Sequence, residues 1–196
     1  QLKLPGASKY AQDAMLVKNK IDTDFWNAQQ QYFHNGKMRD GSYMPDATVL
    51  AAVPIYLNAV TDHEKMKKVA GRLGNNYFST DWGIRIIEDS SKKYRAGSYH
   101  AGMVWPLYGG WASLAEYKAG YYNNGYRHIM NNLLQYRHWA PGSIEETLNG
   151  DIFKPNGVCS HQCWSETMIL QPAIEGMLGF DADVLNNQLR LSPAFP

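Results

Sequence analysis

The chain has 196 residues, of which 44% are hydrophobic and 19% are charged. This length and composition are typical of one globular domain or of a large piece of one. The formal net charge is only +1, which argues against a nucleic-acid binder and against docking to an anionic membrane surface. No run of about 18 apolar residues is present, so no membrane-spanning helix is expected.

The ends and the cysteines say little about cellular location. Gln1 is not an initiator Met and no signal-peptide pattern follows it, so we expect a trimmed start. Cys159 and Cys163 do not make a disulfide framework. The compartment stays open between the cytoplasm and the periplasm of a bacterial-type cell, and no cofactor is expected.

Six segments have the apolar spacing or the end signals of helices. They cover about residues 8–34, 46–60, 62–73, 102–118, 124–138 and 160–179. Ser8, Asp46 and Asp62 are the expected N-caps of the first three segments, and Pro54 is expected to bend the second. The closing segment 189–191 alternates like a short strand.

The connections alternate in length. Long segments rich in Gly, aromatic and charged residues, at about 35–45, 75–101 and 139–159, precede the second, fourth and sixth helices. This rhythm predicts an all-α fold of three αα-hairpins over one domain, residues 1–196, with short strands in loops that gather at one end. The alternative is a plain helical bundle, which composition alone would favour.

Carboxylates cluster in the last long connection, in P-G-S-I-E-E-T-L-N-G-D. Glu145 and Glu146 should point to opposite sides of an extended chain, so only one of them can face a site. Glycoside hydrolysis needs a carboxylate that activates water or attacks the sugar, opposite an acid that protonates the leaving oxygen. The alternative is a solvated acidic loop.

Three other segments carry candidate ligand-binding side chains. In S-Y-H-A-G-M-V-W-P, His100 could bind sugar hydroxyls and Trp105 could supply a wall, or His100 could cap a helix and Trp105 could be core. The segment D-W-G-I-R sets Trp82 near Arg85. Tyr43 and Asp46 stand at a loop-to-helix junction, where Asp46 would more commonly be a cap.

Other chemistries have weaker support. Cys159, His161 and Cys163 form C-x-H-x-C, but on a helix His161 would point away from both cysteines, so we expect no metal site. The sequence has no phosphate-binding Gly-rich loop, dinucleotide fingerprint or nucleophile elbow.

The ordered set of F-W, D-W-G-I-R, S-Y-H-A-G-M-V-W-P, E-E-T-L-N-G-D, S-H-Q-C-W-S and L-R-L-S-P resembles bacterial glycogen-debranching amylo-α-1,6-glucosidases. Processing oligosaccharide glucosidases share this general layout. The likeness covers nearly the whole chain. It implies an (α/α)₆ toroid of six helical hairpins, of which this chain would supply about half as the C-terminal portion of the catalytic domain.

The resemblance also implies site residues. Aligned on the run from Leu148 to Asp151, the catalytic base of the family falls on Glu146, whereas Glu145 takes the place of its usual proline, which leaves the choice between the two glutamates open. The aspartate that serves as acid in the family has no counterpart here. The other implied sugar-binding residues are His100, Trp105, Trp82, Arg85, Gln162, Trp164, Tyr43 and Asp151.

These features predict an inverting hydrolase of α-linked glucosides, of the glycogen or malto-oligosaccharide debranching type, that is inactive as this fragment. Its partners would be an oligosaccharide or polysaccharide substrate and the missing N-terminal half of the same protein. An exposed apolar seam could also drive self-association. The rival hypotheses are a non-catalytic sugar-binding or structural toroid, and a sugar epimerase or isomerase that would use His100 and His161.

Overall fold

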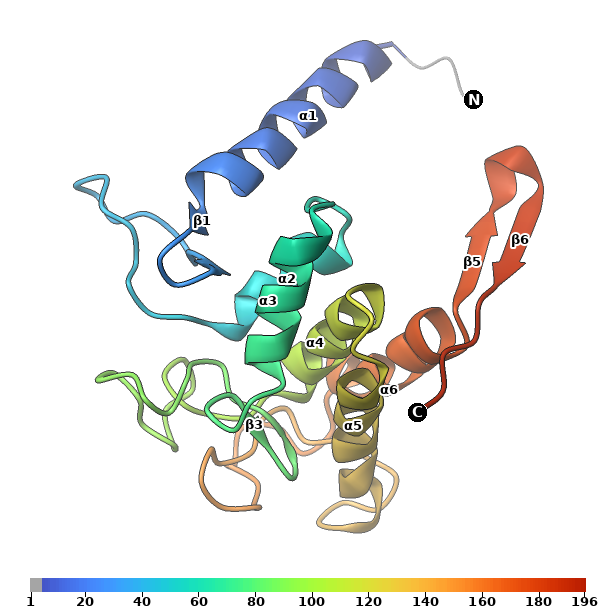
Figure 1. The fold of residues 1–196 in the computed structure, drawn as a ribbon. Coiled ribbons are helices and arrows are strands. Elements are labelled where there is room, and N and C mark those ends of the chain that lie inside the picture. Colours follow the sequence, from blue (N-terminus) through green and yellow to red (C-terminus); the bar gives the residue numbers. More distant parts are fainter. Residues whose placement is uncertain (1–4) are drawn as a thin grey trace.

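A computed structural model describes residues 5–196, and in that range the protein is mainly helical, with six α-helices and three short antiparallel strand pairs (Figure 1). The helices are α1 (Ala7–Asp24), α2 (Ala52–Tyr56), α3 (His63–Leu73), α4 (Pro106–Lys118), α5 (Tyr122–Leu133) and α6 (Cys163–Gln171). The strand pairs are β1 (Trp26–Asn27) with β2 (Tyr32–Phe33), β3 (Ser79–Thr80) with β4 (Gly83–Ile84), and β5 (Phe180–Asp183) with β6 (Gln188–Leu191). The all-α class is therefore confirmed.

Helix α4 is the centre of the fold and packs against α2, α3, α5 and α6. Two glycines make this packing close. A β-carbon on Gly110 would lie 2.7 Å from the Met168 sulfur of α6, and one on Gly109 would lie 2.9 Å from the Asn132 side chain of α5. The link from α4 to α5 turns through Gly120 at φ 83°, a left-handed conformation that glycine adopts without strain.

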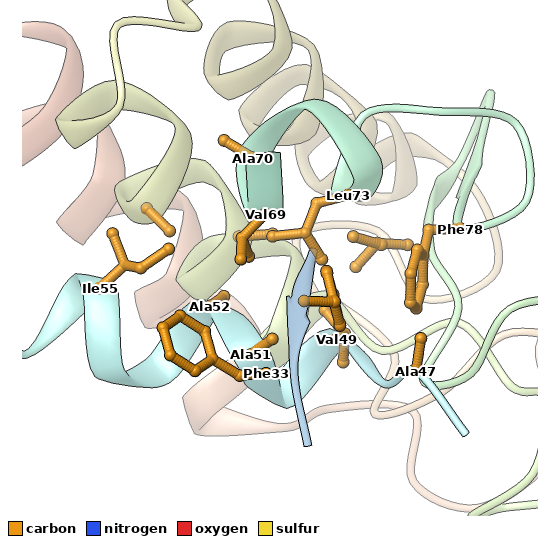
Figure 2. Packing of buried hydrophobic residues seen from close by; sticks show 14 of the residues in the cluster. Phe33, Ala47, Val49, Ala51, Ala52, Ile55, Val69, Ala70, Leu73 and Phe78 are labelled. Carbon is orange, nitrogen blue, oxygen red and sulfur yellow. The ribbon is translucent and has the colours of Figure 1, made fainter. Parts of the chain in front are cut away.

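The hydrophobic core cluster lies between α2, α3, α4 and the first strand pair (Figure 2). Ile55 of α2 and Val69 and Leu73 of α3 are fully buried there, and Phe33 and Phe78 close the cluster from the adjoining segments. Apolar residues at helical spacing therefore form the core, as the sequence indicates for residues 62–73. Asp62 caps α3 as predicted, because its side chain accepts hydrogen bonds from the backbone of Glu64 and Lys65.

The first helix is much shorter than the predicted 8–34. It begins after Gly6 rather than at a Ser8 cap, and it ends at Asp24. The Asn27 side chain then accepts hydrogen bonds from the backbone N–H groups of Gln29 and Gln30, which starts a turn instead of a further helical turn. The turn allows Tyr32 and Phe33 to be buried, so tertiary packing overrides local helix propensity.

The second helix also differs from the prediction. Asp46 is not its cap: the carboxylate accepts hydrogen bonds from Lys93 and Ser91, at 2.6 and 2.7 Å, and the Lys93 ammonium is the main cause of its lowered pKa. The segment begins with a 3₁₀ turn at Val49–Ala51 and α2 ends at Tyr56 rather than near Val60. Pro54 is the third residue of α2, which has only five residues, so the long helix that Pro54 was expected to bend does not form.

The remaining helices start later than predicted or change type. Helix α4 begins at Pro106 rather than near residue 102, since proline suits the first helical position. Helix α5 continues as a 3₁₀ turn, Leu134–Arg137. Helix α6 begins at Cys163 and passes at Pro172, which lacks a backbone N–H, into a π-helical turn, Pro172–Met177. A 3₁₀ turn, Val184–Asn186, separates β5 from β6, and β6 contains the predicted strand 189–191.

A fully buried polar chain ties the helices to β3. His128 of α5 contacts the Glu116 carboxyl of α4 at 2.7 Å through Nδ1 and the Ser79 hydroxyl at 2.9 Å through Nε2. Ser79 donates its own proton to the carbonyl of Leu73 at 2.8 Å, so the His128 Nε2–H must donate to Ser79. One proton is thus shared between Glu116 and His128, and burial raises the pKa of Glu116.

Two of the three long connections gather at one end of the helices, whereas the tip of the 35–45 segment lies apart from them (Figure 1). Helix α1 extends from the body and has no buried residue. Apolar side chains are exposed on α1, including Met15, Leu16 and Val17. A hollow of about 550 Å³ between α1 and α2 continues this apolar surface. The apolar seam at which further hairpins would pack remains a prediction. Among residues 5–196, no helix has the length and apolarity required to cross a membrane.

Candidate active site

A ladder of isolated β-bridges brings three of the sequence motifs together, and we call it the loop ladder. Its rungs pair Arg85 with Val104, Val104 with Leu148, and Leu148 with Pro155. The central rung is a reciprocal pair of backbone hydrogen bonds between Val104 and Leu148, at 2.9 and 3.0 Å. Hydrogen bonds from the backbone N–H of Glu146 to Cys159 and from that of Gln162 to Ile144 add the segment before α6.

Glu146 lies on this ladder and faces the S-Y-H segment. It is 5% exposed, and its carboxylate accepts a short hydrogen bond from the Tyr99 hydroxyl. The Tyr99 ring packs edge-on against His100 at 4.8 Å and against Trp105 at 4.4 Å between ring centroids. Burial and the bond to Glu146 raise the pKa of Tyr99 to about 12, so its hydroxyl stays a donor at neutral pH.

His100 and Trp105 have different environments around Tyr99. The two rings are nearly parallel, with centroids 6.5 Å apart, but His100 is exposed and Trp105 is only 4% exposed. Trp105 donates its indole N–H to the Tyr99 carbonyl at 3.0 Å and belongs to the core cluster. Its burial fits the alternative that it is a core residue, which here supports Tyr99. His100 is not the cap of α4, because Trp105 occupies that position.

Glu145 is as buried as Glu146 but has a different environment. It is 5% exposed, and burial raises the pKa of its carboxyl. The structure gives Glu146, and not Glu145, a hydrogen bond to the aromatic segment. The two neighbouring glutamates are therefore distinguished by their partners, as their alternation along the chain indicates.

Arg85 and Asp151 hold the end of the Glu146 loop. Arg85 is 8% exposed, and its guanidinium donates to the Gly150 carbonyl at 3.0 Å and to the Asn76 carbonyl at 2.9 Å. Asp151 accepts a hydrogen bond of 2.6 Å from Tyr94, whose pKa burial and this bond raise to about 12. Arg85 and Asp151, which were both predicted to bind sugar, thus form hydrogen bonds within the protein, although the Asp151 side chain remains exposed.

Trp82 and Gln162 contact the same loops, and Trp164 lies two residues after Gln162. The Trp82 indole N–H donates to the Asn149 carbonyl at 3.0 Å. Gln162 is the N-cap residue of α6, and Trp164 in the first turn is 42% exposed. The structure therefore brings the motifs containing Trp82, Arg85, His100, Glu146 and Gln162 into one region.

Tyr43 is not brought to this region. Its ring stacks on His34 at 4.4 Å, meets Phe25 edge-on at 5.7 Å, and lies 4.6 Å from the Lys37 ammonium. Each of these neighbours belongs to the segment between α1 and α2. The role in sugar binding that the resemblance implies for Tyr43 remains a prediction.

The C-x-H-x-C sequence does not form a helical face, since Cys159 and His161 precede α6. His161 instead contacts Glu166 of α6, at 2.7 Å. Within residues 5–196, no group of three or more His, Cys, Asp or Glu side chains is arranged to hold a metal ion.

Three residues that organise this region were not predicted from the sequence. Tyr99 contacts Glu146, Tyr94 contacts Asp151, and the Asn149 side chain accepts hydrogen bonds from the backbone of Asp151 and Ile152. Tyr99 immediately precedes His100, so the aromatic pattern did contain a signal. The residue types alone did not indicate whether the Tyr99 or the His100 ring would contact the Glu146 carboxylate.

Comparison with known proteins identifies the family of this chain. Residues 3–165 match the sequence profile of the mannosylglycerate hydrolase MGH1-like glycoside hydrolase domain. No curated protein matches the chain in a sequence search.

Solved structures agree on the fold. The chain superimposes on a protein described as a sialidase with a TM-score of 0.81 and 18% identity, over 97% of this chain and 19% of the other. For the GH63 mannosylglycerate hydrolase from Thermus thermophilus in complex with glucose, the TM-score is 0.62, the identity 14% and the coverage 79% and 37%. For neutral trehalase from Saccharomyces cerevisiae, the TM-score is 0.64 and the identity is 12%. The alignment covers 85% of this chain and 30% of the trehalase chain.

These identities show the fold alone, and the chain spans less than two fifths of each of these structures. The helical fold is that of the (α/α)₆ glycosidases, of which this chain supplies a part. With most of its length matched to one family profile, the chain belongs to the MGH1-like glycoside hydrolase family.

Proposed function

We propose that this chain supplies the catalytic base of an inverting hydrolase that acts on α-linked glucosides, of the glycogen or malto-oligosaccharide debranching type. The observation that carries the proposal is the position of Glu146. Its carboxylate is buried on the loop ladder and receives the Tyr99 hydroxyl, beside the exposed His100 ring. A carboxylate held in this way suits proton abstraction from water.

In the proposed reaction, water attacks the anomeric carbon on the face opposite the glycosidic bond, and Glu146 takes its proton. The bond between the anomeric carbon and the leaving oxygen breaks, and a carboxylic acid from a segment outside this chain gives that oxygen its proton. Tyr99 occupies one oxygen of Glu146, which leaves the other to face the water.

The other predicted residues would divide between binding and support. His100, Gln162 and Trp164 would contact the sugar next to the scissile bond, and Trp82 would contact the substrate further from that bond, because their motifs meet around the Glu146 loop. Arg85 and Asp151 would fix the loop that follows Glu146, and Trp105 would support Tyr99. Tyr43 would reach the sugar only in the complete toroid.

A second candidate substrate is a small α-glycoside of glycerate, because the family that matches residues 3–165 is described by mannosylglycerate hydrolase. Such a substrate would place its glycosidic bond at Glu146, and it would be too short to reach sugar-binding positions further from that bond. The two candidates differ in the size of the leaving group and not in the chemistry of the base.

The proposal is tested on a longer form of the protein that contains this chain. Incubation with α-1,6-branched malto-oligosaccharides should release glucose that is first seen by NMR as the β-anomer, which is the product of inversion. Mannosylglycerate should be cleaved more slowly, and the 196-residue chain alone should cleave neither. Initial release of the α-anomer would contradict inversion, and failure to cleave any α-glucoside would contradict the proposed substrate class.

A further inference from the structure

Four aromatic side chains form a cluster beside the candidate site, and we call it the aromatic lip: Trp82, His138, Trp139 and Phe153. Phe153 is its centre, with ring centroids 4.8 Å from Trp139, 5.1 Å from His138 and 6.2 Å from Trp82. His138 and Trp139 follow the 3₁₀ turn after α5, whereas Phe153 belongs to the loop that follows Glu146. Three chain segments therefore converge on one set of rings.

The lip is exposed although it is well supported. Trp139 is 41% exposed and His138 is exposed, whereas Trp82 and Phe153 are half-buried beneath them. Trp82 is fixed through its hydrogen bond to the Asn149 carbonyl, and the backbone N–H of Asn149 donates to the Lys154 carbonyl across the turn that carries Phe153. Large rings held at a surface by hydrogen-bonded loops are preorganised for contact with a ligand.

The lip is close to the proposed base along the chain. Asn149, whose carbonyl accepts the hydrogen bond from Trp82 of the lip, follows Glu146 by three positions, so the α-carbons of Asn149 and Glu146 are at most about 11 Å apart. Both lie on the loop-rich end of the helices, where the connections 75–101 and 139–159 gather (Figure 1). A chain of sugar rings with its terminal residue at Glu146 could therefore reach the lip.

We propose that the aromatic lip is an outer subsite that binds a pyranose ring of an oligosaccharide, beyond the sugar at the scissile bond. A pyranose presents a flat C–H face to Trp139 and Phe153, while its hydroxyl rim meets water and the exposed Asp151 and Lys154 side chains. This inference rests on the proposed function and selects the extended substrate over the small glycerate glycoside, which is too short to occupy both places.

Binding to the full 196-residue chain tests the lip without any need for hydrolysis. Glucose, maltose and maltoheptaose are titrated by calorimetry, with tryptophan fluorescence as a second signal. Affinity should increase with chain length, and Trp139→Leu should lower the affinity for maltoheptaose roughly tenfold, because it removes about 60 Å² of flat apolar contact. Trp139→Phe keeps a flat ring and should retain most of the affinity.

Tyr10→Ala is the matched control, since Tyr10 is an exposed aromatic residue on α1, outside the lip. It should leave maltoheptaose affinity unchanged. Equal affinities for maltose and maltoheptaose, or equal losses in Trp139→Leu and Tyr10→Ala, would overturn the outer subsite. Length-dependent binding that needs Trp139, in a protein whose longer form cleaves no α-glucoside, would support the lip and contradict the proposed hydrolysis.

Discussion

The loop ladder and helix α1 show opposite relations between sequence pattern and burial. Helix α1 has the longest run of helix-favouring residues, yet none of its side chains is buried. The ladder has weak periodicity and many glycines, yet it buries Arg85, Glu145 and Glu146. Local helix propensity therefore stabilises α1, whereas specific contacts between distant segments stabilise the ladder. Substitutions should have very different effects on stability in the two regions.

The largest loss of stability is expected where the ladder is anchored to the helices. His128→Ala leaves the buried Glu116 and Ser79 groups without their shared partner and opens a cavity, which should cost about 2–4 kcal/mol. Urea unfolding of the variant and the parent chain measures this change. A loss below about 0.5 kcal/mol would mean that the polar chain does not hold β3 to α4 and α5.

The same anchor predicts a pH dependence. Because burial raises the pKa of Glu116, the folded state retains a proton that the unfolded state releases. Its contribution to stability is complete below the ordinary pKa of a glutamate and is lost as the pH rises through the raised value. Glu116→Gln, which does not titrate, should flatten the fall of unfolding free energy in that window, and a slope identical to the parent would contradict the assignment.

The ladder itself should be sensitive to a single methyl group. A β-carbon on Gly150 would lie 2.3 Å from the Gly102 carbonyl and 2.4 Å from the Tyr94 hydroxyl. Gly150→Ala should therefore cost about 1–3 kcal/mol and displace the loop that carries Glu146. Thermal unfolding and the backbone amide NMR signals of residues 146–151 measure the two effects. Gly157→Ala is a useful comparison, because space is open around Gly157, although its φ of 75° adds strain.

A smaller and purely local effect is expected at Tyr99. Tyr99→Phe removes the donor to Glu146 and keeps the ring contacts with His100 and Trp105. We expect hydrolysis to slow by about tenfold through loss of orientation, with little change in stability. Because the pKa of Tyr99 is raised to about 12, the loss should be constant from about pH 6 to 9. A loss that varies strongly in that range would contradict this role.

The smallest effect is expected on α1. Leu16 is 59% exposed, so Leu16→Ala should change the unfolding free energy of this chain by less than about 0.5 kcal/mol. Chemical unfolding checks this value. In a longer form of the protein that covers the apolar surface of α1, the same substitution should lower the unfolding free energy by more than it does in this chain. Equally small effects in both forms would contradict the coverage of α1.

The sequence predicted the elements that depend on neighbouring residues. The cap at Asp62 and the strand at residues 189–191 follow from short-range rules, and the structure contains both. It did not predict that Asp46 pairs with Lys93, 47 residues away, or that Tyr99 contacts Glu146 across a similar separation. These contacts depend on how distant loops pack, and only the family resemblance drew those motifs together in advance.

The central claim is that Glu146, and not its neighbour, is the base of a glycosidase site. The most direct measurement compares the turnover of Glu146→Gln and Glu145→Gln on the same α-glucoside, in the longer form of the protein, with folding checked by thermal unfolding. We expect the turnover of Glu146→Gln to fall by about 10²–10⁴-fold. Glu145→Gln should lose little activity, because an uncharged side chain suits a buried site where the carboxyl pKa is raised. Full activity in Glu146→Gln, or the larger loss in Glu145→Gln, would contradict the central claim.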